Sequence, residues 1–65
     1  MTKQKGKTLT RKELTILTLL SRGLMYKEMA NMENVNINTI KKHCKSIYRK
    51  IEVRNRTEAT NYYNS

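Results

Sequence analysis

Residues 36–51 read NINTIKKHCKSIYRKI. If this stretch forms an α-helix, its apolar residues recur on one face at intervals of three and four. These residues are Ile40, Cys44, Ile47 and Ile51. The other side carries cationic and hydrogen-bonding groups: Asn38, Lys41, Lys42, Lys45, Ser46 and Arg49. A helix with one side for a core and one cationic side can meet phosphates and base edges in a DNA groove.

The length and composition of the chain indicate one small domain. The chain has 65 residues, and a chain of this length buries only about 60% of the surface that its unfolded form exposes. Cys44 is the one cysteine in the sequence, so an intrachain disulfide is excluded. No apolar run reaches the roughly 18 residues of a membrane span. Residues 1–8 lack the apolar segment of a secretory signal. We therefore expect a cytoplasmic protein.

The charge is strongly positive and unevenly placed. The formal net charge is +9, and all five acidic residues are glutamates. Between residues 37 and 56 one acid, Glu52, stands among seven cations: Lys41, Lys42, Lys45, Arg49, Lys50, Arg54 and Arg56. This clustering favours a polyanionic partner. The alternative is a surface charged for solubility.

Local signals predict helices joined by short turns and no strand. Residues 1–8 have no apolar pattern and are expected to form a flexible basic arm, with a helix-turn-helix domain over residues 9–65. The spacing of Thr10 and Glu13 is that of a capping box, and Gly23 is suited to end the first helix. A second helix is expected from about Tyr26 to Met32. We expect the inward side chains of these two helices to be Ile16, Leu17, Leu20, Leu24, Met29 and Ala30.

The remaining two helices also have recognisable starts. Asn36 is a good N-cap for the third helix. Asn55 and Glu58 repeat the capping-box spacing and open a fourth helix that runs to about Tyr63. A tight turn between the second and third helices, with the third basic on its outer face, indicates an all-α helix-turn-helix fold.

The order of these motifs resembles the LuxR-type (GerE-like) helix-turn-helix family. The matching residues are Leu9-Thr10, Glu13, Ile16-Leu17, Leu19-Leu20, Gly23-Leu24, Lys27-Glu28-Met29-Ala30, Thr39-Ile40-Lys41, His43, Ile47-Tyr48-Arg49-Lys50-Ile51, Val53 and Asn55-Arg56-Thr57-Glu58-Ala59. The resemblance runs without a gap over residues 9–60. It implies a four-helix domain of bacterial transcription regulators whose third helix enters the major groove.

The chain departs from the family pattern at five places, of which the first is Lys12, where the family prefers Arg. Met25 replaces the usual Ser or Thr cap of the second helix, and Glu52 replaces a common Gly after the third. Glu33 stands where the family has a core Leu, and we expect Met32 to fill part of that space. The fourth helix is short, which shortens the surface through which the family commonly dimerises.

The resemblance assigns base reading to Lys41, Lys42 and Lys45. Lysine can donate to guanine O6 and N7, or it can contact phosphate alone. Asn38 can pair with adenine or only shield the helix start. Phosphate contacts are expected from Lys27, Thr39, Ser46, Arg49, Arg54 and Arg56.

The fourth helix supplies the expected assembly surface. We place a weak homodimer contact at Ala59, Tyr62 and Tyr63. Of the two adjacent tyrosines, one is expected to close the core and the other to be exposed.

Other chemistries find no support in the sequence. The chain has no Asp and a single His, so no catalytic constellation is recognised. His43 next to Cys44 lacks further ligands for a metal site, and Cys44 is expected to be a small core residue. We expect neither an enzyme nor a cofactor.

The leading hypothesis is a sequence-specific double-stranded DNA-binding regulator of transcription, associated with the nucleoid. We expect a stand-alone domain controlled by its abundance or by a partner. An alternative is a protein-interaction modulator that pairs with larger family regulators or RNA polymerase, supported by Leu14, which falls off the apolar stripe. Binding of the third helix to a membrane surface is disfavoured because its apolar stripe is needed for the core.

Overall fold

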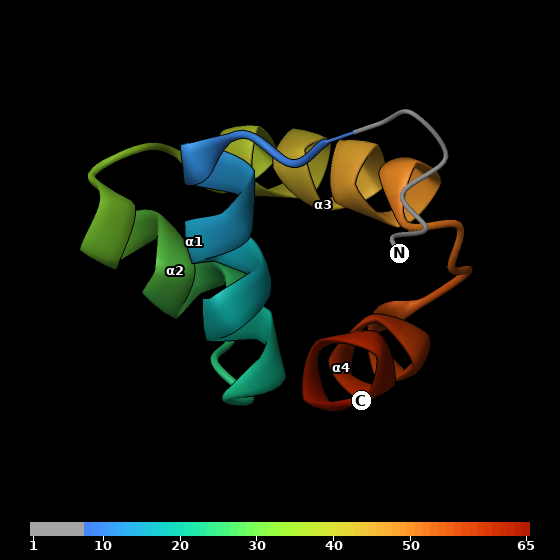
Figure 1. Ribbon diagram of the computed structural model, residues 1–65. Coiled ribbons are helices and arrows are strands. Elements are labelled where there is room, and N and C mark those ends of the chain that lie inside the picture. Colours follow the sequence, from blue (N-terminus) through green and yellow to red (C-terminus); the bar gives the residue numbers. More distant parts are fainter. Residues whose placement is uncertain (1–7) are drawn as a thin grey trace.

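The computed structural model describes residues 8–65, which form four helices (Figure 1). They are α1 (Arg11–Ser21), α2 (Tyr26–Glu33), α3 (Ile37–Lys50) and α4 (Arg56–Asn64). The predicted all-α fold and the order of the helices are confirmed. The predicted basic arm lies outside the described residues except for Thr8, which precedes α1 in a non-helical segment.

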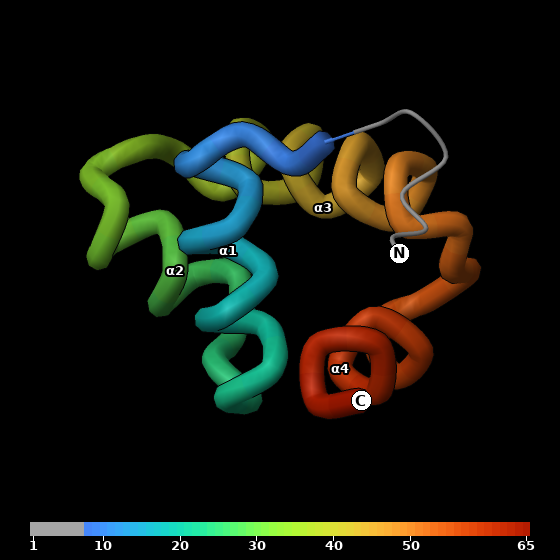
Figure 2. The backbone as a smooth tube through the Cα atoms, in the orientation of Figure 1, coloured from blue at the N-terminus to red at the C-terminus, as the bar shows by residue number. Residues whose placement is uncertain are grey.

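The helices surround a core to which all of them contribute. α1 packs against both α3 and α4, and α2 packs against α3. Figure 2 shows α3 running across the top of the view, α1 and α2 below it, and α4 near the C-terminus, seen almost end-on. α2 and α3, joined by a short turn, form the helix-turn-helix unit.

The predicted N-caps of α1, α3 and α4 are confirmed. The side chain of Thr10 accepts a hydrogen bond from the Glu13 amide at 3.1 Å, and the Glu13 carboxylate accepts one from the Thr10 amide at 2.9 Å. Asn36 caps α3 through the Thr39 amide, and Asn55 caps α4 through the Glu58 amide, each at 3.0 Å. These short-range bonds satisfy amides that the first turn of a helix leaves unpaired.

α2 begins with half of a capping box. The Met25 amide donates to Glu28 Oε1 at 2.7 Å, but the thioether of Met25 makes no capping hydrogen bond. The absence of a polar cap at this position, expected from the sequence, is therefore confirmed.

Three residues in the helix junctions have left-handed backbones. Gly23 has φ of +87°, Asn34 of +57° and Glu52 of +59°. Glycine adopts this conformation freely and asparagine tolerates it, whereas most other L-residues lose roughly 1–2 kcal/mol there. Glu52 thus occupies a conformation better suited to the glycine that the family has after its third helix.

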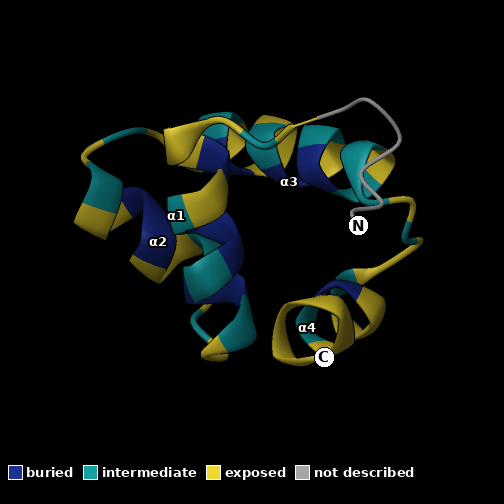
Figure 3. Cartoon of the chain, viewed as in Figure 1, coloured by how far each residue is buried: buried dark blue, intermediate teal, exposed yellow. Residues whose placement is uncertain are grey.

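The core agrees largely with the predicted inward positions (Figure 3). The buried hydrophobic residues are Ile16, Leu17, Leu19, Leu20, Met29, Ala30, Ile40, Cys44, Ile47 and Ala59. Leu24 and Ile51 pack against this core but are only partly buried. Leu19 is an additional core residue that the predicted inward set did not include.

The expectation that Met32 fills the place of the missing leucine is wrong. Met32 is 61% exposed. Glu33 lies three and four residues after Ala30 and Met29, and therefore on their face of α2. Its side chain is 18% exposed, and its Oε1 lies 3.0 Å from Lys12 Nζ on α1. An ion pair between α1 and α2 thus stands where the family packs an apolar side chain.

Candidate nucleic-acid interface

α3 has the two-sided character that its sequence predicts. On its inner side Ile40 and Ile47 are 0% exposed and Cys44 is 2% exposed. On its outer side Asn38 and the four cations Lys41, Lys42, Lys45 and Arg49 are exposed. The buried side holds the helix against α1 and α2, so the exposed side chains project from a supported surface.

A buried carboxylate anchors the second half of α3. Glu13, on α1, is 5% exposed. Its Oε1 accepts hydrogen bonds from Lys50 Nζ at 2.7 Å and from the Thr10 amide at 2.9 Å, and its Oε2 accepts one from Ser46 Oγ at 2.8 Å. These contacts join the start of α1 to two consecutive turns of α3.

The anchoring carboxylate is ionised at neutral pH. Burial by itself raises the pKa of Glu13, but the hydrogen bonds from Lys50, the Thr10 amide and Ser46 outweigh it and lower the pKa to about 2. Glu13 therefore forms a partly shielded ion pair with Lys50, whose side chain is 25% exposed. The sequence pattern indicated only the capping role of Glu13, because nothing local in the sequence indicates its partners on α3.

The surroundings of Ser46 count against its assignment to a phosphate contact. The Ser46 hydroxyl is only partly exposed and donates to Glu13. Its proton is therefore engaged, and the neighbouring carboxylate repels a phosphate. Ser46 positions α3 instead of belonging to its cationic side.

The surroundings of Arg56 likewise count against its assignment to a phosphate contact. One nitrogen of its guanidinium donates to the carbonyl of Leu20 at 3.2 Å and to that of Leu24. The guanidinium carbon lies 5.9 Å from the centre of the Tyr26 ring, within cation–π range. Arg56 thus donates to one carbonyl in the last turn of α1 and to one in the turn that follows, and it links α4 to the start of α2.

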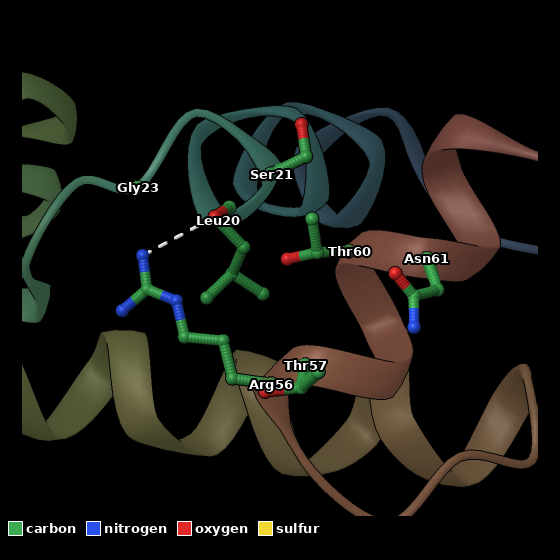
Figure 4. Close-up of a pocket in the computed structure, with 7 residues that line it drawn as sticks. All are labelled: Leu20, Ser21, Gly23, Arg56, Thr57, Thr60 and Asn61. Carbon is green, nitrogen blue, oxygen red and sulfur yellow. Dashed lines mark hydrogen bonds between the residues drawn. The ribbon is translucent and has the colours of Figure 1, made fainter.

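Figure 4 shows Arg56 reaching from α4 toward Leu20, at one side of an open pocket. The pocket has a volume of about 270 Å³ and lies between the end of α1 and α4. Its lining consists of Leu20, Ser21, Gly23, Arg56, Thr57, Thr60 and Asn61. None of the exposed α3 cations belongs to this lining, so the pocket and the cationic side of α3 are separate surfaces.

Among the other expected phosphate contacts, the three cations are compatible with their role. Lys27, Arg49 and Arg54 are exposed. Thr39 is partly buried, and its hydroxyl lies 3.3 Å from Asn36 Oδ1, to which it donates. The structure thus brings Thr39 and Arg49 onto α3, with Lys27 on α2 and Arg54 in the turn before α4.

The surface of α4 differs from the expected dimer contact. Ala59 is 0% exposed because it packs against α1 within the chain, so its assignment to the contact is wrong. Tyr62 and Tyr63 are 45% and 40% exposed, so the expectation that one ring closes the core is also wrong. The Tyr63 hydroxyl is not isolated, since Thr18 Oγ1 donates to it at 3.3 Å.

The buried thiol has the expected structural role. Cys44 lies in the core, and burial raises its pKa, which keeps the thiol protonated and unreactive.

Among residues 8–65, no three potential metal-ligating side chains come together. No helix in this part of the chain is long and apolar enough to span a membrane.

The sequence of this chain matches a known family and several curated proteins. Residues 7–63 match the family described as bacterial regulatory proteins, luxR family. The chain is 42% identical over 53 residues to YhjB of Escherichia coli (strain K12), described as an HTH-type transcriptional regulator. It is 39% identical over 54 residues to the response regulator protein VraR of Staphylococcus aureus (strain Mu3 / ATCC 700698).

These matches are nearly complete for this chain but partial for the relatives. They cover 82% and 83% of the chain, and 26% of YhjB and of VraR alike. The chain therefore spans about a quarter of the length of the curated relatives that it matches. The helix order, the capped helix starts and the match over residues 7–63 lead to one conclusion: this chain belongs to the LuxR family of bacterial regulatory proteins.

Proposed function

We propose that this chain binds double-stranded DNA in a sequence-specific manner and regulates transcription, with α3 in the major groove. The observation that carries the proposal is the exposed row of Lys41, Lys42, Lys45 and Arg49 on a helix whose opposite side is buried. A helix of this width fits the major groove, and a fixed helix can present the same side chains to the same bases at each encounter.

Base reading is assigned to Lys41, Lys42, Lys45 and Asn38. Lys41 and Lys45 are four residues apart and lie one above the other on α3. Lysine donates to guanine O6 and N7, and asparagine pairs with adenine N6 and N7. Phosphate contacts are assigned to Lys27, Thr39, Arg49 and Arg54. In this proposal the chain has no catalytic role and acts in the cytoplasm at the nucleoid.

Selection of bound duplexes from a random pool, followed by measurements on variants, tests this function. Replacing Lys41 or Lys45 by Ala should weaken the selected site more than an unrelated sequence, by about 1–3 kcal/mol at the contacted base pair. Lys12→Ala is the matched control, because Lys12 is a lysine on α1 that pairs with Glu33 of α2 and does not belong to α3. If both variants weaken all sequences equally, the lysines contact phosphates only.

A second candidate role is pairing with a larger family regulator or with RNA polymerase. It rests on exposed apolar side chains outside α3, namely Leu14 at 51% and Tyr62 at 45%. Leu14→Lys and Tyr62→Lys should abolish recruitment of purified polymerase or regulator to a bound site while leaving the affinity of the chain for a single half-site undiminished. Unchanged recruitment by both variants would remove these residues from a partner surface.

A further inference from the structure

Ile37 is an exposed apolar residue at the start of the cationic helix. It is the first residue of α3 and is 40% exposed. Seven partly buried hydrophobic residues pack against the core, among them its neighbour Val35, but Ile37 is not one of them. Ile37 therefore presents a branched apolar side chain to water at the start of α3.

The position of Ile37 on α3 relates it to the proposed base-reading residues. Ile37, Lys41 and Lys45 follow one another at intervals of four, so they form one row along the helix surface. The helix rises about 6 Å over four residues, which corresponds to roughly two base-pair steps of about 3.4 Å. A helix that places Lys41 against a base edge thus brings Ile37 close to a base pair about two steps away.

The major groove offers one apolar group on its base edges, the C5 methyl of thymine. The remaining groups are hydrogen-bond donors and acceptors, which suit Lys41, Lys45 and Asn38. We infer that Ile37 contacts a thymine methyl and so adds a thymine preference near the base pairs read by the lysines. This inference rests on the proposed function. Its driving force is removal of the isoleucine side chain and the methyl group from water.

Replacing thymine by deoxyuridine tests the contact, since the exchange removes the C5 methyl and keeps the hydrogen-bonding groups. Each thymine of the selected site is exchanged in turn, and Kd is measured for the wild-type chain and for Ile37→Ala. At one thymine we expect the exchange to weaken binding of the wild-type chain about fourfold, which corresponds to the loss of one buried methyl group. Ile37→Ala should lose this sensitivity at that thymine alone.

Met32→Ala is the matched control. Met32 is 61% exposed and lies on α2, outside the row formed by Ile37, Lys41 and Lys45. This variant should retain the response to deoxyuridine. Circular dichroism is used to check that both variants are folded. We expect them to be, because alanine is well accepted in a first helical turn.

The outcomes separate this inference from the function on which it rests. If the chain selects a sequence but no exchange weakens it, or if Ile37→Ala keeps the full sensitivity, the thymine contact is overturned and sequence-specific binding stands. If Ile37→Ala weakens every sequence equally, Ile37 is a general contact and the inference also fails. If no sequence is preferred in the selection, the proposed function fails first.

Discussion

At the scale of single residues, Glu13 joins two helices through one buried carboxylate. A carboxylate that is 5% exposed would be costly if it were unpaired. Three hydrogen bonds, of which the one from Lys50 is also an ion pair, offset that cost and orient α3 relative to α1. The same network excludes Ser46 and Lys50 from the surface available for DNA. Glu13 thereby separates the anchoring part of α3 from its exposed cationic row.

Acid should destabilise the fold through Glu13. Its pKa lies at about 2 in the folded chain, against an ordinary value of 4.5. Its contribution is therefore present above pH 4.5 and is lost as the pH falls toward 2, because the unfolded chain binds the proton first. At pH 7 this contribution is roughly 3 kcal/mol.

Urea unfolding of Glu13→Gln measures this contribution. The variant should lose most of it at pH 7, and its difference from the wild-type chain should shrink near pH 2.5. Ser46→Ala removes one hydrogen bond of the network and should cost less, about 1 kcal/mol. An equal loss for Glu13→Gln at both pH values would contradict the role of the ionised carboxylate.

Met25 offers a simple route to a more stable fold. Serine at this position can accept a hydrogen bond from the first turn of α2, which Met25 cannot do. We expect Met25→Ser to raise the free energy of unfolding by about 1 kcal/mol. The control is Met32→Ser, the same exchange at an exposed methionine near the other end of α2. Equal melting temperatures for the two variants would show that a polar cap at residue 25 does not stabilise the fold.

At the scale of helices, α3 and α4 use arginine in opposite ways. Arg49 is exposed on α3, whereas Arg56 is partly buried and donates to carbonyls at the end of α1 and in the turn that follows. A helix terminus that receives such a donor is held in place, and this contact also places Arg56 above the ring of Tyr26 on α2. Through Arg56, α4 therefore contacts both the end of α1 and the first residue of α2.

The salt dependence of DNA binding should distinguish the role of Arg49 from that of Arg56. Each phosphate that a cation neutralises contributes about −0.9 to the slope of log K against log salt. Arg49→Ala should reduce the slope by about one unit while the fold keeps its stability. Arg56→Ala should lower the melting temperature and leave the slope unchanged when measured below that temperature. A slope for the wild-type chain shallower than about −3 would contradict the assigned set of contacts.

At the scale of the whole molecule, the chain is small and strongly cationic. Its accessible surface is 4683 Å² and its formal net charge is +9. A standard protein interface buries about 800 Å² on each partner, which is a large share of this surface. α4 has nine residues, and its exposed aromatic side chains are Tyr62 and Tyr63. Charge repulsion between copies further weakens association in free solution.

We therefore predict a monomer or a weak dimer in free solution, with two copies meeting on DNA. Half-sites about one helical turn apart, roughly 10 bp, would place both α3 helices on one face of the duplex. Sedimentation at micromolar concentration tests the first part, which a tight dimer would contradict. Tyr63→Ala and Tyr62→Ala test the second part, because they should reduce cooperative binding to a paired site. Leu14→Ala is the control for an exposed apolar residue on α1.

The sequence alone was sufficient for the local features of this protein. The capped starts of α1, α3 and α4, the left-handed Gly23 and the apolar side of α3 were all predicted correctly. Each of them depends on residues three or four positions apart, whose geometry a helix or a turn determines by itself. The family match over residues 7–63 confirms the fold that these signals indicated.

The tertiary structure alone decided which polar side chains remain available at the surface. Ser46 and Lys50 meet Glu13 across 33 and 37 positions, and Arg56 reaches Leu24 and Leu20 across 32 and 36 positions. Ala59 was likewise removed from the surface by the packing of α4 on α1. Helical periodicity gives the direction of a side chain on its own helix but not what the neighbouring helix places against it. A buried charge must find a partner wherever the fold provides one, and that partner can lie anywhere along the chain.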